Sequence, residues 1–123
     1  MCDNVMDLDK VNLISASNGI HELFQYVKIG QLNDHMLNIV KAEGRALDFH
    51  AHEDSDEMFL VIEGSMRLEF NNRSIDLEQG DFIIVPRGVM HRTVTRGPVT
   101  ALLIEKSGTL NKGNTGGTYT DKV

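Results

Sequence analysis

From Glu22 onward the sequence is a succession of short apolar stretches, each interrupted by turn-forming residues. Several stretches are rich in β-branched or aromatic residues, which favour strands. No segment after residue 20 keeps a 3.6-residue apolar period beyond two turns. Many short strands with frequent turns predict an all-β sandwich or closed barrel. The segments expected to form strands are Leu23–Ile29, Met36–Lys41, Ala46–His52, Glu57–Ile62, Met66–Phe70, Ser74–Leu77, Phe82–Val85, His91–Thr95 and Val99–Glu105.

The chain divides into three parts by composition. Residues 1–20 are mixed and end in the turn dipeptide Asn18-Gly19, which indicates an N-terminal extension. Residues 21–106 hold all the strand-like segments, and we expect them to form the barrel. Residues 107–123 are rich in Gly, Thr, Asn and Lys and are expected to form a C-terminal tail. A length of 123 residues is typical of a single domain.

Charge and composition exclude several classes of protein. The net charge is −6, and the Lys and Arg residues are scattered, so a basic surface for nucleic acid is not expected. No apolar run approaches the roughly 20 residues of a membrane span, and no basic segment followed by an apolar run opens the chain. The single cysteine, Cys2, excludes an intramolecular disulfide. These features predict a cytoplasmic protein without membrane partners.

Three of the expected strands are apolar on both faces. They are Met58–Ile62, Phe82–Val85 and Ala101–Ile104. One face of such a strand can line the barrel interior, and the other needs cover from the N-terminal strands or from a partner subunit. This pattern favours a homodimer, with cover inside the same chain as the alternative.

His50 and His52 are the first candidates for a functional site. On a helix, side chains two residues apart point about 200° away from each other, whereas on a strand they share one face. In an extended segment the two imidazoles can therefore reach one small ion. Imidazole is a preferred ligand of Zn, Cu, Fe and Ni, and carboxylate also suits Mn.

A carboxylate and a third histidine follow. Glu57 begins the strand after the polar residues 53–56, which are expected to form a hairpin turn. By spacing alone, Glu53 and Asp56 are alternatives to Glu57. His91 follows the turn at residues 86–90, in which proline fixes φ and glycine allows a conformation closed to other residues. That turn can direct His91 back into the barrel.

The spacing of these residues resembles the two motifs of the cupin family. The first motif is matched by Gly44, His50, His52, Glu57 and Gly64, and the second by Gly80, Pro86, Gly88 and His91. Thr95 stands where the second motif usually has Asn, which is not a metal ligand in the family. The resemblance covers residues 44–95 and implies a jelly-roll antiparallel β-barrel. It also implies one divalent transition metal ion held by His50, His52, Glu57 and His91.

Three imidazoles and one carboxylate leave one or two positions of a five- or six-coordinate ion for water or substrate. We therefore expect a metal-dependent enzyme of the isomerase, dioxygenase or lyase type, acting on a small oxygenated molecule. By resemblance to some cupins, Glu57 is also the candidate catalytic base. The alternative is a non-catalytic module that binds or senses a small ligand, and a cavity beside Phe59 and Val61 would favour the enzyme.

The chemistry of the substrate and of the ion is less constrained. A phosphosugar would require clustered basic residues, and only Arg45 and Arg87 lie close to the motifs, so this substrate is disfavoured. The ligand set accepts Mn, Fe, Co, Ni, Cu or Zn, because affinity order does not identify the ion that a protein carries in the cell.

Overall fold

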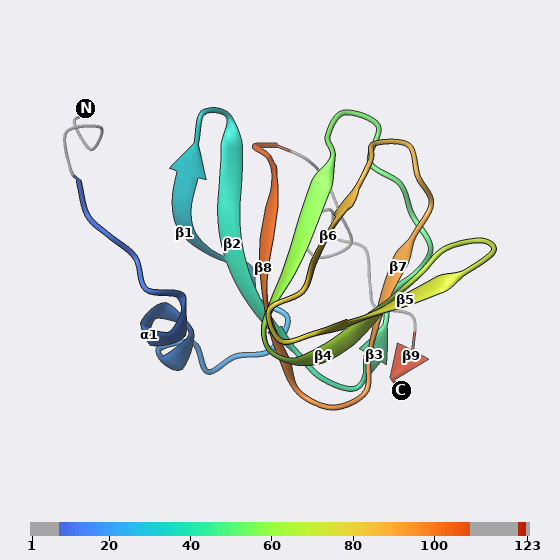
Figure 1. Ribbon diagram of the computed structural model, residues 1–123, viewed down its shortest axis with the longest axis horizontal. Helices are drawn as coiled ribbons and strands as arrows, with labels where there is room; N and C mark the ends of the chain where they lie inside the picture. The colour runs from blue at the N-terminus through green and yellow to red at the C-terminus, as the bar shows by residue number, and fades with distance from the viewer. Residues whose placement is uncertain (1–7, 109–120, 123) are drawn as a thin grey trace.

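The computed structural model describes residues 8–108 and 121–122 (Figure 1). Cys2 and most of the expected tail lie outside these residues. The described elements are α1 (Leu13–Asn18), β1 (Val27–Leu32), β2 (His35–Ala42), β3 (Arg45–Ala46), β4 (Glu57–Glu69), β5 (Ser74–Glu78), β6 (Phe82–Val85), β7 (Arg92–Thr95), β8 (Val99–Lys106) and β9 (Asp121–Lys122). No helix among them is long and apolar enough to cross a membrane.

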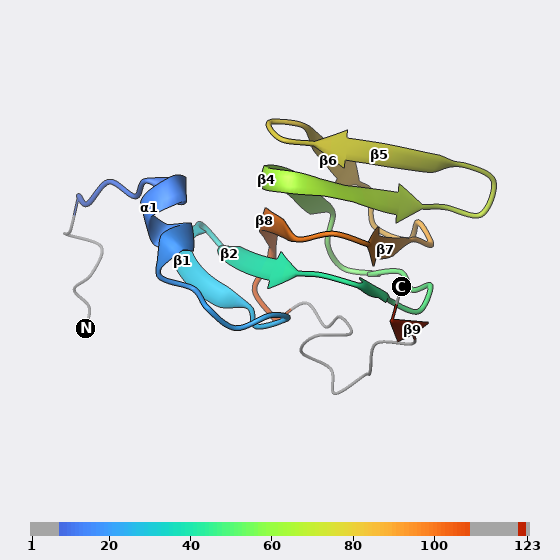
Figure 2. The same ribbon diagram turned by 90° about the horizontal axis from the view of Figure 1, so that it is seen from below.

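The strands form two antiparallel layers that share β4. The first half of β4 pairs with β8 and β6, and β8 continues the sheet to β2 and β1. The second half pairs with β5 and β7, and β7 continues to β3 and β9. Figures 1 and 2 show the two layers facing each other around a common interior. The prediction of an all-β antiparallel barrel in one domain is confirmed.

The expectation of two separate strands at Glu57–Ile62 and Met66–Phe70 is wrong, because β4 runs from Glu57 to Glu69 without a break. Gly64 has a φ of +84°, and the register against β8 shifts between Val61 and Glu63. A Cβ at Gly64 would lie only 2.2 Å from the carbonyl oxygen of Pro98, so no other residue fits there without movement. The glycine therefore marks a bend that carries one strand from the first layer into the second.

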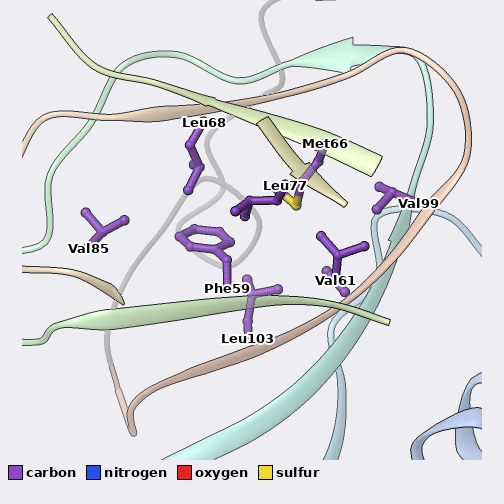
Figure 3. Packing of buried hydrophobic residues seen from close by; sticks show 9 residues of the cluster. Phe59, Val61, Met66, Leu68, Leu77, Val85, Val99 and Leu103 are labelled. Carbon is purple, nitrogen blue, oxygen red and sulfur yellow. The ribbon is translucent and has the colours of Figure 1, made fainter. Parts of the chain in front are cut away.

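The core fills the interior between the two layers. Figure 3 shows Phe59 and Leu103, from the first layer, pointing toward Leu68 and Leu77 of the second. Phe59 and Leu103 are register partners on β4 and β8, so the alternation of these strands sends both inward. Each such burial contributes roughly 1.5–3 kcal/mol. The buried cluster comprises Phe59, Val61, Met66, Leu68, Leu77, Val85, Val99, Ala101 and Leu103.

A second apolar cluster covers much of the outer face of the first layer. Ile39, Ile62 and Leu102 are buried there, with side chains of α1 and β1 packed against them. Figures 1 and 2 show α1 on the β1–β2 side of the molecule. Cover within the chain thus accounts for the outer faces of β8 and part of β4. Phe82 and Ile84 of β6 are instead 58% and 54% exposed. The outer face of β6 is therefore the part of this layer for which a partner subunit is still the expected cover.

Candidate metal centre

The segment that carries the first two histidines is only partly a strand. A regular strand was expected at Ala46–His52, but the paired strand β3 covers only Arg45–Ala46. Ala46 lies opposite Val94 in this pairing. Further along, His50 lies opposite His91, one residue out of that register. Such a bulge locally re-aims side chains, and bulges are frequent next to functional sites. The irregular pairing with the β7 segment, rather than a regular strand, places His50 here.

Three histidines converge at this bulge. The backbones of His50 and His91 exchange two hydrogen bonds of 2.9 Å, and their ring centroids are 4.6 Å apart. The ring of His52 lies 5.0 Å from that of His50 and 5.6 Å from that of His91. One ligand nitrogen from each ring lies within 4.8 Å of the others, which is close enough to hold one ion. The structure therefore brings together all three predicted histidines.

Hydrogen bonds set the tautomer of two of these rings. His50 Nδ1 lies 2.8 Å from the carbonyl oxygen of Asp48, and His91 Nδ1 lies 2.9 Å from that of Val89. A carbonyl oxygen can only accept, so each Nδ1 carries the hydrogen and donates. The lone pair of each ring is then on Nε2. Fixing the tautomer and ring orientation in this way is what outer hydrogen bonds do for metal-binding histidines.

Glu57 lies beside the histidines as the first residue of β4, and it is 3% exposed. Its Oε1 is 3.2 Å from His52 Nε2 and 3.4 Å from His91 Nε2. Glu57 Oε1 and His91 Nε2 are both buried and make no hydrogen bond with the described residues. Buried polar atoms in this condition are costly, and a cation between them would satisfy both. The donor set of imidazole nitrogens and a carboxylate suits a divalent transition metal.

The electrostatics favour the metal-binding forms of the ligands. Burial raises the pKa of Glu57, but interactions with His52, His91 and Glu105 outweigh burial and lower that pKa overall. Burial lowers the pKa of His50, the hydrogen bond to Asp48 partly opposes this, and the neighbouring histidines lower it further. Near neutral pH the site therefore presents a carboxylate and a neutral imidazole, the states that bind metal.

The alternatives to Glu57 lie outside the cluster. Glu53 and Asp56 are exposed. Asp56 Oδ1 accepts a hydrogen bond of 2.9 Å from the backbone N–H of Arg87, and the N–H of Gly88 donates to the carbonyl of His52 at 2.8 Å. These bonds tie the turn before His91 to the loop after His52. Asp56 thus fastens the two loops together instead of reaching the histidines.

One buried acid at the site was missed by the sequence analysis. Glu105 is 1% exposed and lies directly opposite Glu57 in the β4–β8 pairing. Ligand atoms of His52, Glu57 and Glu105 lie within 4.8 Å of one another. The alternation of the strand could have indicated it, because Glu105 is two residues after Leu103 and four after Ala101, and so lies on the same inward face of β8.

A cavity opens from Glu57 into the barrel. Its volume is about 50 Å³. Phe59 lines it as expected, but Val61 does not. Arg45 also lines it, with its guanidinium 4.3 Å from the centre of the Phe24 ring. The wall is mostly apolar, and its polar side chains include Arg45, Glu57, Thr93 and Thr95.

The family follows from comparison with known proteins. The model of the cupin domain family matches residues 38–105, a segment that contains all of the clustered histidines and both acids. This chain belongs to the cupin family. Cupins commonly bind a metal, and the His/Glu cluster of this cupin could hold one.

Similar proteins agree with this assignment. The uncharacterized protein YdbB of Bacillus subtilis is 34% identical over 83 residues, which cover 67% of this cupin and 73% of YdbB. The tetracenomycin polyketide synthase protein TcmJ of Streptomyces glaucescens is 32% identical over 76 residues, covering 62% of this cupin and 51% of TcmJ. This cupin thus spans about half the length of TcmJ. A cupin-2 domain protein of Shewanella frigidimarina has a crystal structure with a TM-score of 0.74 and 28% identity, covering 78% of this cupin and 93% of that chain.

Proposed function

We propose that this cupin is a metal-dependent enzyme that acts on a small oxygenated molecule, in a reaction of the isomerase, dioxygenase or lyase type. The observation that carries the proposal is the position of Glu57, which belongs both to the buried cluster and to the wall of the cavity. A bound divalent ion would polarise a carbonyl or enediolate oxygen of the substrate. The proposed ligands are His50, His52, Glu57 and His91.

The side chains around the site suit that chemistry. His50 and His91 are held by their Nδ1–H bonds, so Nε2 of each ring faces the cluster without rearrangement. Glu57 is buried as a carboxylate, and its proposed second role is to accept a proton from a substrate carbon or oxygen that enters the cavity. The mostly apolar wall leaves room for only a few water molecules beside the reacting groups, which strengthens electrostatic interactions there.

The lining also limits the substrate. A mostly apolar cavity with Arg45 and Thr93 as polar groups suits an oxygenated molecule with an apolar body. Arg87 is exposed and does not line the cavity, so a phosphosugar would meet one arginine rather than a cluster. The similarity to a polyketide synthase protein supports an apolar, oxygen-bearing substrate.

A non-catalytic ligand-binding module is the second candidate function. The observation in its favour is the small interior space of about 50 Å³, which holds only a few water molecules. Under this hypothesis the metal-loaded protein binds a small oxygenated molecule without converting it. Turnover of a small oxygenated molecule by the metal-loaded wild type would decide for the enzyme, and binding without turnover would decide for the module.

The first experiment is elemental analysis of the protein purified without added metal. We expect a stoichiometric divalent transition metal in the wild type and its loss in His52→Ala. His35→Ala is the matched control, because His35 lies on β2 paired with Asp34 at the surface. No metal in the wild type, even after reconstitution with Mn, Fe, Co, Ni, Cu and Zn salts, would contradict the proposal.

We also propose that this cupin forms a homodimer through the outer face of β6. The exposed Phe82 and Ile84 lie opposite Leu60 and Met58 of β4 in the sheet, and both partners are only half-buried. These side chains continue the apolar face that α1 and β1 cover elsewhere. A second copy would place the same apolar strip against itself, as a two-fold interface requires.

A further inference from the structure

Arg45 places a positive charge in the wall of the mostly apolar cavity that Glu57 also lines. The two charged residues lie toward opposite ends of the interior. Glu57 pairs with Val85, whereas Arg45 closely follows Ala42, which pairs with Val99. Figure 3 shows Val85 and Val99 on opposite sides of the core. The cavity therefore has the proposed metal site at one end and a cation at the other.

The pairing of the second layer gives the separation of these two ends. Arg45 lies opposite Thr95, and His50 of the metal site lies opposite His91. His91 and Thr95 are four residues apart, which is roughly 13 Å at about 3.3 Å per residue of extended chain. Side chains that reach inward from both ends shorten this gap. A molecule with a body of a few carbon atoms can therefore bridge it.

Arg45 is held both at its backbone and at its guanidinium. Thr95 Oγ1 accepts a hydrogen bond from the N–H of Arg45 and donates one to its carbonyl oxygen, each at 3.2 Å. The guanidinium carbon is 4.3 Å from the centre of the Phe24 ring, within the range of cation–π attraction. This attraction does not use up the five N–H donors of a guanidinium, whose planar fork matches the two oxygens of a carboxylate.

Phe24 reaches Arg45 from an unfavourable backbone conformation. Its φ is +63°, a region that bulky side chains rarely adopt. The N–H of Phe24 donates a hydrogen bond of 2.7 Å to the carbonyl oxygen of Lys41, which fixes this segment beside β2. Residues held in such conformations cluster at ligand sites. The strain therefore points to a binding role for the Phe24–Arg45 pair.

We propose that the substrate is a small carboxylate with an apolar body, and that Arg45, positioned by Phe24, binds its carboxylate while its other end lies beside Glu57. This inference rests on the proposed function and names its substrate class. One guanidinium matches the single charge of a carboxylate, whereas a phosphate dianion would keep an unmatched charge in an apolar cavity. The cavity of about 50 Å³ limits the body to a few carbon atoms.

The probes are butanoate and butanamide, which share an apolar body and differ in charge. Their dissociation constants are measured by NMR titration of the full chain, both loaded with Zn²⁺ and free of metal. Arg45→Met removes the charge and keeps an unbranched side chain. Phe24→Leu removes the ring and leaves the same unfavourable φ for a non-glycine residue. Arg87→Met is the matched control, because it removes the same charge from an exposed arginine that does not line the cavity.

We expect the wild type to bind butanoate about 10-fold or more tightly than butanamide, with and without Zn²⁺. Arg45→Met should lose this preference, Phe24→Leu should reduce it several-fold, and Arg87→Met should retain it. Equal affinities in the wild type, or an unchanged preference in Arg45→Met, would overturn the proposal. An unchanged preference in Phe24→Leu would overturn the positioning role of Phe24.

The two metal states separate this proposal from the proposed function. A preference for butanoate that requires Zn²⁺ would overturn the assignment to Arg45, because the carboxylate would then bind the ion. A wild type that binds no metal ion and still prefers butanoate would contradict the proposed function and support the carboxylate site at Arg45.

Discussion

Gly64→Ala is expected to be strongly destabilising for a reason that can be separated into two parts. A non-glycine residue at positive φ costs roughly 1–2 kcal/mol, partly offset by the about 0.4–1 kcal/mol gained when the unfolded chain loses freedom. The φ of Gly64 is +84°, so this part applies in full. The added Cβ would also lie 2.2 Å from the carbonyl oxygen of Pro98 and 3.1 Å from Cα of Val99. Forcing such a contact typically costs a further 1–3 kcal/mol. Added to a net backbone cost of about 1 kcal/mol, this gives a total destabilisation of roughly 2–4 kcal/mol.

Gly80 isolates the backbone part, and Gly30 serves as a baseline with neither part. Gly80 has a φ of +90°, and beyond its chain neighbours no heavy atom lies within 4 Å of the place that a Cβ would take, so Gly80→Ala should cost only about 1 kcal/mol. Gly30 has neither the positive φ nor a close neighbour, so Gly30→Ala should be near neutral. Urea unfolding of the metal-free proteins measures the series. An equal loss in Gly64→Ala and Gly80→Ala would refute the steric reasoning.

The same substitution should leave metal affinity unchanged at a temperature where the variant is folded. Gly64 and Glu57 lie on the same strand, but the ladder between Glu57 and Val61 stays in register with β8 and fixes the metal-proximal end. At about 4 °C per kcal/mol, Gly64→Ala lowers Tm by roughly 8–16 °C. Calorimetry with Co²⁺ at low temperature tests whether affinity is retained, and a large loss there would show that the bend shapes the site.

Three further predictions address acidity, assembly and substrate. The pKa of His50 is lowered from 6.5 and that of Glu57 from 4.5, so the unfolded chain binds more protons than the folded protein. The stability of the metal-free protein should therefore fall as the pH drops below about 6.5 and again below 4.5. A rise in the urea unfolding free energy on acidification would contradict this. Phe82→Asp should convert the proposed dimer to a monomer by sedimentation without loss of bound metal, whereas a wild type that is already monomeric would refute the interface. Arg45→Met should raise KM for an anionic or carbonyl substrate by about 10-fold or more with little change in metal content, and an unchanged KM would remove Arg45 from substrate binding.

The fold was predictable because its strands are short and locally marked. Alternation along Met66–Phe70 and the apolar run at Val99–Glu105 indicate strands with little help from the rest of the chain. The continuity of β4 through Gly64 is not predictable from local sequence, because the role of Gly64 depends on Pro98, which approaches it only in the folded barrel. The strand expected at Leu23–Ile29 also begins later than predicted, at Val27. Phe24, inside the expected strand, has a φ of +63°, which is not an extended conformation.

The residues of the candidate site could be predicted from their spacing, but the way in which the backbone brings them together could not. Spacing brought His50, His52, Glu57 and His91 into one hypothesis, and the structure places these side chains together. The bulge opposite His91 depends on pairing between segments far apart in the sequence, so the expected regular strand through His52 could not reveal it. Glu105 carries no motif, and only its pairing with Glu57 exposes its place at the centre.

The shared strand β4 has a consequence for how the chain acquires its structure during synthesis. The first half of β4 and the whole of β2 both pair with β8. These two strands of the first layer therefore cannot complete their pairing until β8, near the end of the described barrel, has been synthesised. Until β8 emerges, β2 has only the β1 hairpin on one side and an open edge on the other. Such long-range pairing slows folding and leaves apolar strand edges exposed to other chains. Truncation before Val99 should therefore yield an aggregating polypeptide and not a smaller barrel.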